Sequence, residues 1–213
     1  MHPVSPVNHV FVKMQAYDDT VKTESGVTLF KDTTFNPEWS ATLSAEALSV
    51  PIKVGQIDGD TEGVLPFVQK GDQILFRYIV VQQLEQRDND TPIHHNQHLI
   101  DGEIYWKVNY SMILGVVRNG ELIPAPGYVF AKPVVNMLEE RKGILYLPDS
   151  VRKQEQKDRA VVVCSGVPKK DRADLELRKD DVIVYRPGMA EKYELNGEQY
   201  LVIRQEYIAA KEV

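Results

Sequence analysis

The chain has 213 residues, of which 25 are Lys or Arg and 31 are Asp or Glu, so its formal net charge is −6. Apolar residues make up 43% and charged residues 26%, a balance typical of a folded globular protein rather than a disordered one. An acidic chain without a basic run is a poor candidate for binding nucleic acid. The single cysteine, Cys164, excludes an intrachain disulfide framework and a Cys-rich metal site.

Membrane insertion and secretion are not expected either. The longest apolar stretch, Met112 to Val117, is far shorter than the ~20 residues that span a bilayer. The first residues, Met-His-Pro-Val-Ser-Pro, contain neither the basic nor the apolar part of a secretion signal. We therefore expect a cytoplasmic protein that does not contact a membrane.

Predicted β-strands occur along the whole chain, as short runs rich in Val, Ile, Tyr and Phe between Gly, Pro, Asn and Asp. In chain order these runs are His9–Met14, Asp72–Val81, Ile104–Tyr110, Ile113–Val117, Gly127–Pro133, Arg159–Cys164, Asp181–Tyr185, Lys192–Leu195 and Gln199–Arg204. Asn119-Gly120 and Asn196-Gly197 predict hairpin turns, because such turns need positive φ at both central residues. Helical periodicity is limited to Ser44–Leu48 and Val134–Arg141. The pattern predicts an all-β fold.

Three long polar segments interrupt the strand pattern, at Asp18–Glu38, Gln82–Gln97 and Gly143–Lys157. The first and the third each carry a small apolar cluster directly after a glycine, at Gly26–Phe30 and Gly143–Leu147. Loops longer than ~12–15 residues in compact domains are usually functional or disordered. The two apolar clusters are therefore candidate binding sites. The alternative is that they are ordinary strand residues packed on the wall of the fold.

The same order of elements occurs twice in the chain. The first copy opens at His9–Lys13 and the second at Tyr128–Lys132. In each copy a loop with an apolar cluster follows, then an apolar stretch, then a charged turn with a strand, at Lys70–Phe76 and Lys179–Tyr185. Two closing strands end each copy. The repetition predicts two small β domains rather than one large one.

The second copy resembles a subunit of the GroES-type co-chaperonin (chaperonin-10) family. The segments that carry the resemblance are, in order, Gly143-Ile144-Leu145, Arg159-Ala160-Val161-Val162, Lys179–Tyr185, Asn196–Ile203 and Glu206-Tyr207-Ile208-Ala209. In the first copy, Ser25–Leu29, Lys70–Phe76 and Tyr110–Leu114 occupy the same places. The chain departs from the family pattern because neither loop has a double glycine, Thr28 replaces an aliphatic residue, and Asp180 stands where Gly is usual.

The resemblance implies an all-β fold of two tandem GroES-like β-barrels. The first barrel would comprise residues 1–123, with a mobile loop at 18–38 and an insertion at 82–97. The second would comprise residues 124–213, with a mobile loop at 143–157. Each mobile loop would carry the residues that bind a partner protein.

The function implied by the resemblance is that of a co-chaperonin, a ring-shaped lid on the folding chamber of a GroEL-like chaperonin in its ATP- or ADP-bound state. Such a protein is not an enzyme and needs no cofactor or metal. The chaperonin-binding residues would be Gly26, Val27, Thr28 and Leu29 in the first loop and Gly143, Ile144, Leu145, Tyr146 and Leu147 in the second.

The ring implied by the family joins the opening strand of one barrel to the closing strand of its neighbour, and exposed strand edges favour such pairing. The oligomer contacts would then be Val10, Phe11, Val12, Tyr207, Ile208 and Ala209. The candidate open edges are His9–Lys13 and Tyr207–Ala210, and Ile113–Val117 would meet Gly127–Lys132 inside one chain.

Two other functions remain open from the residues. One is a structural or decoration ring protein that keeps the barrel but does not bind a chaperonin. The other is a metal-binding module or metal-dependent enzyme that uses His94, His95 and His98, because imidazole suits Zn, Ni or Cu. No helix is expected around these histidines, since Thr91-Pro92 precedes them, so we expect a solvated loop there.

Overall fold

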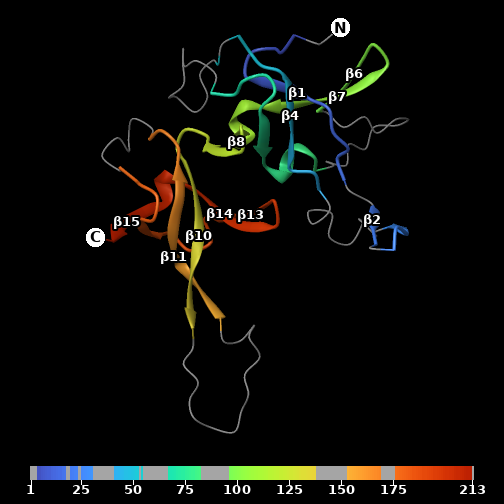
Figure 1. Cartoon of the computed structure of the whole chain (residues 1–213). Coiled ribbons are helices and arrows are strands. Elements are labelled where there is room, and N and C mark those ends of the chain that lie inside the picture. Colours follow the sequence, from blue (N-terminus) through green and yellow to red (C-terminus); the bar gives the residue numbers. More distant parts are fainter. Residues whose placement is uncertain are drawn as a thin grey trace. The chain divides into compact units, whose positions relative to one another are not determined.

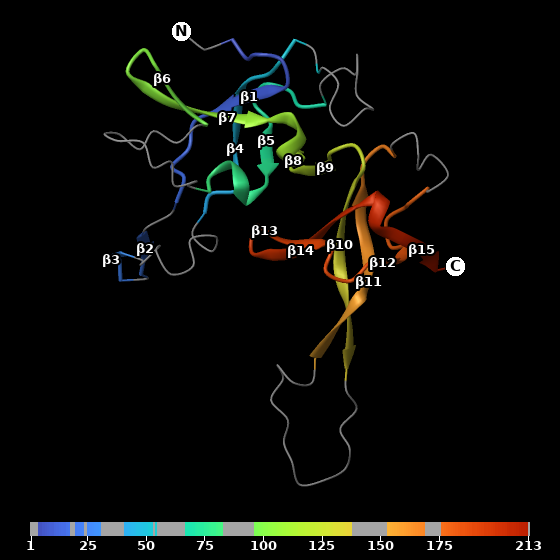
Figure 2. The same cartoon turned by 180° about the vertical axis from the view of Figure 1, so that it is seen from behind.

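The computed structural model describes residues 4–17, 20–23, 25–30, 41–52, 54, 67–82, 96–137, 153–168 and 176–212. The chain divides into two compact units, Met1–Leu122 and Ile123–Val213 (Figures 1 and 2). The described residues form strands, turns and short 3-10 helices, with no α-helix among them. The predicted all-β class is therefore confirmed. No helix in the described part of the chain is long and apolar enough to cross a membrane.

A seven-stranded sheet in the order β6-β7-β1-β4-β5-β8-β9 lies in unit 1, except that the last two residues of β9 belong to unit 2. Its strands are β1 (His9–Val12), β4 (Ser44–Ser49), β5 (Gln73–Phe76), β6 (Gln97–Ile100), β7 (Glu103–Asn109), β8 (Ile113–Arg118) and β9 (Glu121–Pro124). Two 3-10 helices, η1 (Tyr78–Val80) and η2 (Tyr110–Met112), follow β5 and β7. A separate two-stranded sheet consists of β2 (Thr20–Lys22) and β3 (Thr28–Phe30).

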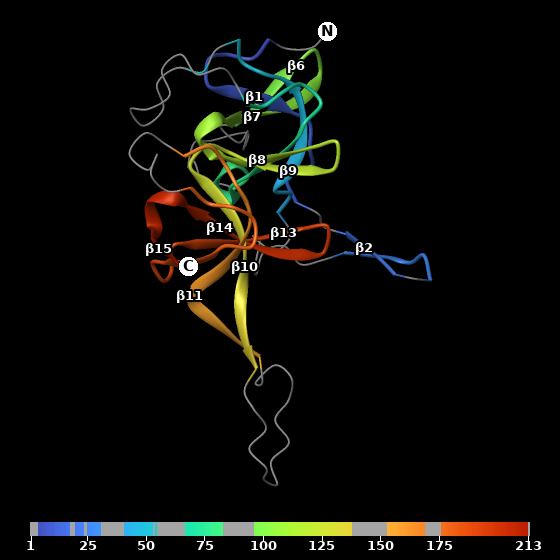
Figure 3. The same cartoon turned by 60° about the vertical axis from the view of Figure 1, so that its left-hand side comes forward.

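Unit 2 contains a six-stranded sheet in the order β13-β14-β10-β11-β12-β15. Its elements are β10 (Tyr128–Met137), β11 (Lys153–Ser165), β12 (Val182–Tyr185), β13 (Ala190–Leu195), β14 (Glu198–Arg204), the 3-10 helix η4 (Gln205–Tyr207) and β15 (Ile208–Glu212). β10 and β11 extend beyond the other strands as a two-stranded arm (Figure 3). The core is lined by alternate residues of these strands, among them Val129, Val162, Ile183, Leu201 and Ile203.

Equivalent backbone hydrogen bonds occur in the two units. The N–H of Tyr110 donates to the carbonyl oxygen of Asn8 at 2.8 Å, and the N–H of Gln205 donates to that of Gly127 at the same distance. The β5–β8 and β12–β15 ladders also have the same register, each with an irregularity before its last pair. The two sheets therefore follow one plan of strand pairing.

The two Asn-Gly turns have the predicted conformation. Asn119 and Gly120 have φ of 52° and 82°, and Asn196 and Gly197 have φ of 53° and 78°. The turn before β5 places Gly71 at φ 90°, and the equivalent turn before β12 places Asp180 at φ 70°. Asp180 thus adopts the left-handed conformation that a glycine adopts more easily.

Several predicted elements are wrong in kind or in extent. Ser44–Leu48 and the start of Val134–Arg141 are not helical, because they lie in β4 and β10 and pair with neighbouring strands. Residues 153–157 of the predicted second loop belong to β11, which pairs Lys153 with Met137. β6 was not predicted, and it begins at Gln97, which the predicted insertion included. Residues 83–95 and 138–152 lie outside the described residues.

The predicted strand edges are only partly found. β1 pairs with β4 on one side and β7 on the other, so the prediction of an open edge at His9–Lys13 is wrong. Val10 and Val12 are fully buried as a result. The predicted meeting of Ile113–Val117 with Gly127–Lys132 is also wrong, because β8 pairs with β5 and β9 while β10 pairs with β11 and β14.

Candidate functional site

The first predicted binding cluster lies in the β2–β3 hairpin. Its register pairs Thr20 with Phe30, Val21 with Leu29 and Lys22 with Thr28. Extended backbone on both sides of a turn places successive side chains on opposite faces. The hairpin therefore presents Thr28 and Phe30 on one face and Leu29 on the other.

The turn of this hairpin is held by the side chain of Thr23. The Thr23 hydroxyl accepts the N–H of Val27 at 3.0 Å and lies 3.2 Å from the Val27 carbonyl oxygen, to which it can donate. The hydroxyl of Ser25 lies 2.8 Å from the same oxygen of Thr23. Gly26 has φ of 81°, a conformation that L side chains rarely adopt. The turn is thus ordered by local hydrogen bonds.

The apolar side chains of the hairpin are open to solvent. Val27 is 53% exposed, Leu29 is 52% exposed and Phe30 is 82% exposed. Val27 and Leu29 are therefore not buried against the barrel wall among the described residues, which argues against the alternative considered for this cluster. Several exposed apolar side chains on one hairpin are typical of an interaction site.

The second predicted binding cluster, Gly143–Leu147, lies outside the described residues. The β10–β11 arm leads to this part of the chain from both sides. Val135 on β10 pairs with Glu155 on β11, and Glu155 forms an ion pair with Lys192 of β13 at 3.1 Å. The arm is therefore held to β13 by an ion pair in addition to its own backbone pairing.

An aromatic and charged cluster in unit 1 was missed by the sequence analysis. The ring of Phe11 makes edge contacts with His98 at 6.0 Å and Tyr105 at 6.3 Å between centroids. The Lys13 ammonium lies 5.0 Å from the centre of the Tyr105 ring and pairs with Glu103. Hydrogen bonds from Lys13 and Tyr105 lower the pKa of Glu103.

Unit 2 repeats this cluster with one substitution. Phe130 makes edge contacts with Tyr193 at 6.5 Å and Tyr200 at 6.2 Å. Lys132 lies 5.7 Å from the Tyr200 ring centre and pairs with Glu198 at 3.1 Å. Register places His98 opposite Tyr105 and Tyr193 opposite Tyr200. Unit 1 therefore has a histidine where unit 2 has a tyrosine.

His98 is half-buried in the cluster of unit 1. Burial, with smaller contributions from Lys107 and His9, lowers its pKa below the usual 6.5. Its Nε2 atom is buried without a hydrogen-bond partner in the structure. His94 and His95, which would complete the metal site considered above, lie outside the described residues. Among the described residues there is no group of three or more metal-binding side chains.

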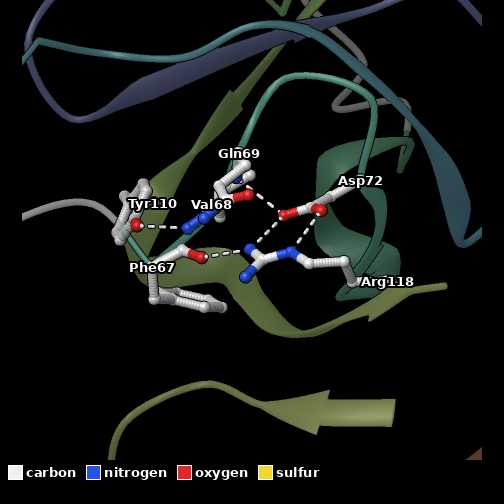
Figure 4. A network of polar contacts seen from close by, with 6 residues as sticks. All are labelled: Phe67, Val68, Gln69, Asp72, Tyr110 and Arg118. Carbon is white, nitrogen blue, oxygen red and sulfur yellow. Dashed lines mark hydrogen bonds and ion pairs between the residues drawn. The ribbon is translucent and has the colours of Figure 1, made fainter. Parts of the chain in front are cut away.

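A polar network stabilises the end of β8 in unit 1 (Figure 4). Asp72, only 4% exposed, accepts two hydrogen bonds from the guanidinium of Arg118, at 2.8 and 2.7 Å, and one from the N–H of Gln69 at 2.7 Å. Arg118 also donates to the carbonyl oxygen of Phe67 at 2.8 Å. Burial raises the pKa of Asp72, but the hydrogen bonds from Arg118 and Gln69 outweigh it, and the net pKa is lowered.

Tyr110, at the start of η2, extends this network. Its hydroxyl accepts the N–H of Val68 at 3.1 Å, and burial raises the pKa of Tyr110 to about 12. In unit 2 the equivalent residue, Gln205, is 2% exposed and donates to Gly166 and Ser165. In both units a buried polar side chain therefore ties the 3-10 helix to a neighbouring segment.

β15 is an edge strand of the unit 2 sheet and contains Ile208 and Ala209, two of the predicted oligomer contacts. It pairs with β12 on one side and with no other strand among the described residues. β8, which has the equivalent place in unit 1, pairs with β9 as well as β5. The free edge of β15 thus corresponds to an edge that is occupied in unit 1.

The strand order, the turns and the repeated hydrogen bonds define an all-β protein of two tandem domains, and comparison with known proteins identifies the class. The family of the chaperonin 10 kDa subunit matches residues 121–212. The chain is 37% identical over 65 residues to the co-chaperonin GroES of Methanosarcina mazei, covering 30% of this chain and 67% of that protein. It is 28% identical over 82 residues to the co-chaperonin GroES of Thermus thermophilus, covering 36% of this chain and 81% of that protein.

A third relative, the co-chaperonin GroES of an Exiguobacterium species, is 28% identical over 79 residues, covering 36% of this chain and 84% of that protein. The chain belongs to the GroES-type co-chaperonin family. The resemblance deduced from its motifs is thus confirmed, and so is the fold of two tandem GroES-like β-barrels. Membership assigns the chain to the co-chaperonins, a class of proteins that are not themselves enzymes.

Proposed function

We propose that the protein assembles into a ring that closes the chamber of a GroEL-type chaperonin in the cytoplasm, and so assists ATP-dependent protein folding. The first binding segment is Gly26-Val27-Thr28-Leu29 and the second is Gly143–Leu147. The observation that carries the proposal is the exposure of Val27 (53%) and Leu29 (52%) on a separate hairpin of a co-chaperonin family member.

The energetics of one loop favour weak, reversible binding. Ordering a flexible residue costs ~1–2 kcal/mol of backbone entropy. Burying one Val or Leu side chain recovers ~1.5–3 kcal/mol. Three apolar anchors recover ~4.5–9 kcal/mol, which is comparable with the cost of ordering ~5 residues. The hydrogen bonds of Thr23 reduce the ordering cost by holding the turn in advance.

A ring converts such weak loops into tight binding. Several loops that engage one partner together can gain ~10²–10⁴ in affinity through effective concentration. Each loop remains weak by itself, so the lid can leave once the chaperonin changes state. The proposed function therefore depends on oligomerisation.

We assign the contact between copies to the free edge of β15, which includes Ile208 and Ala209 next to Tyr207. Inside the chain, β9 precedes β10 and pairs with β8. Residues 4–8 precede β1 in the same way, since Asn8 and Gly127 make equivalent hydrogen bonds. The partner of β15 would then be residues 4–8 of another copy, where Val4 is 82% exposed. Val10, Phe11 and Val12 would support this contact from the core.

The test is capture of a purified GroEL-type chaperonin by the purified full-length protein in the presence of ATP or ADP. We expect capture by the wild type and its loss in Leu29→Asp, because the charge cannot be buried at an apolar contact. Leu145→Asp tests the second loop separately. Leu99→Asp is the matched control, because Leu99 is 69% exposed but lies in β6, outside the β2–β3 hairpin.

Native mass spectrometry tests the ring. A particle mass of several chains supports the ring, and the mass of a single chain refutes it. A ring that captures no chaperonin favours the structural or decoration role instead. Equal capture by wild type and Leu29→Asp would contradict the assignment of Leu29 as an anchor.

A further inference from the structure

Phe30, which pairs with Thr20 in the β2–β3 hairpin, has a highly exposed aromatic side chain. It is 82% exposed, whereas Phe11 is 6% exposed and Phe76 and Phe130 are fully buried. Aromatic residues, phenylalanine included, are enriched at protein–protein interfaces relative to the rest of the surface. An exposed aromatic ring on this hairpin therefore points to a partner surface.

The register of the hairpin places Phe30 on the face that Leu29 does not use. Phe30 lies opposite Thr20 and Leu29 lies opposite Val21, and consecutive residues of a strand point to opposite faces. Thr28 and Phe30 therefore share one face. Thr28 supplies a small polar group there, so Phe30 is the apolar residue of that face.

We propose that Phe30 is a further chaperonin-contacting residue, so that the hairpin binds its partner by both faces. This inference rests on the proposed function, and it adds a contact outside Gly26–Leu29. The occupant of the second face is the chaperonin surface that holds Leu29, because Phe30 is its chain neighbour and both belong to one paired strand. A partner that accepts this hairpin must offer apolar surface on two sides.

The backbone of the hairpin makes the proposal testable without disturbing the fold. The β2–β3 ladder joins backbone groups, and the turn is held by Thr23 and Val27. Replacing the side chain of Phe30 removes neither feature. Burial of a phenylalanine side chain corresponds to about a tenfold or larger change in affinity.

The experiment measures the affinity of the full-length protein for a purified GroEL-type chaperonin with ATP. The variants are Phe30→Ser, which removes the apolar ring, and Phe30→Leu, which keeps an apolar group. Leu99→Ser is the control for a loss of exposed apolar surface elsewhere in unit 1. Equal unfolding midpoints establish that each variant is folded.

We expect Phe30→Ser to weaken binding about tenfold or more, while Phe30→Leu and Leu99→Ser stay within about twofold of the wild type. Binding that Phe30→Ser leaves unchanged overturns the assignment of Phe30 and leaves the proposed function standing. Absence of binding by the wild type overturns the proposed function and, with it, this inference.

Discussion

Arg118→Met is the substitution whose effect on stability the structure defines best. It removes three hydrogen bonds of the guanidinium, two to Asp72 and one to the carbonyl oxygen of Phe67. The carboxylate of Asp72, 4% exposed, would then be left without its counter-ion. Only the N–H of Gln69 would still donate to it.

The expected cost follows from the burial of the pair. Removing one partner of a buried ion pair costs about 3–5 kcal/mol, because an uncompensated charge remains. The Arg118 side chain is 27% exposed, so water can replace part of the lost interaction. We therefore expect the lower end, about 3 kcal/mol, which corresponds to a fall of roughly 10 °C in the melting temperature of unit 1.

Tryptophan fluorescence is a suitable assay, because both tryptophans of the chain, Trp39 and Trp106, lie in unit 1. Trp106 is 2% exposed and will report the loss of the core. Lys211→Met is the matched control, because it removes an ion pair within unit 2, between Lys211 and Asp181 at 2.8 Å. It should leave the tryptophan transition unchanged.

Two further measurements examine the cause of the loss. The folded pKa of Asp72 lies below its ordinary value of 3.8, so the pair stabilises unit 1 above about pH 4 and loses this effect as the pH falls. The stability difference between wild type and Arg118→Met should therefore shrink below pH 4. Adding Asp72→Asn to Arg118→Met should recover part of the loss. A loss below about 1 kcal/mol, or one independent of pH, would refute the reasoning.

Three other substitutions have defined outcomes. The lowered pKa of His98 disfavours its charged form in the folded state, so unit 1 of the wild type should lose stability as the pH falls below 6.5. His98→Tyr, which copies Tyr193 of unit 2, should remove this loss. Tryptophan melts at pH 5 and pH 8 that respond alike in both proteins would contradict this. Asp180→Gly should stabilise unit 2 by about 1 kcal/mol, measured by circular dichroism, since Asp180 has φ of 70° and the equivalent Gly71 has φ of 90°; a destabilised variant would count against it. Thr23→Val should weaken chaperonin capture severalfold, because it removes the hydroxyl that holds the turn, and Thr23→Ser should restore capture. Undiminished capture by Thr23→Val would show that the turn does not depend on this hydroxyl.

The candidate site was accessible to sequence reasoning because its signals are local. Gly26 indicated a turn, and Val27 and Leu29 directly after it are apolar residues in an otherwise polar segment. Phe30 was part of the same cluster, but the family pattern ends at Leu29, so it was not selected. Its separate face became evident only when the register of β2 with β3 was known.

The strand pairings show what local patterns leave open. β1 was correctly predicted as a strand, but its pattern does not say that β4 and β7 occupy both of its edges. Ser44–Leu48 contains residues that can form a helix, and pairing with β1 and β5 makes it a strand instead. Tertiary pairing thus outweighs weak local propensity.

The amino-acid sequence by itself determined the all-β class, the conformation of the two Asn-Gly turns and the family, because these depend on alternation, on backbone sterics and on the order of short motifs. The tertiary structure alone decided which strand edges are free and which polar groups meet. Asp72 and Arg118 lie 46 residues apart, and the clusters around Phe11 and Phe130 join three strands each. Such contacts form only when the sheet brings distant segments together, and no local pattern encodes their register.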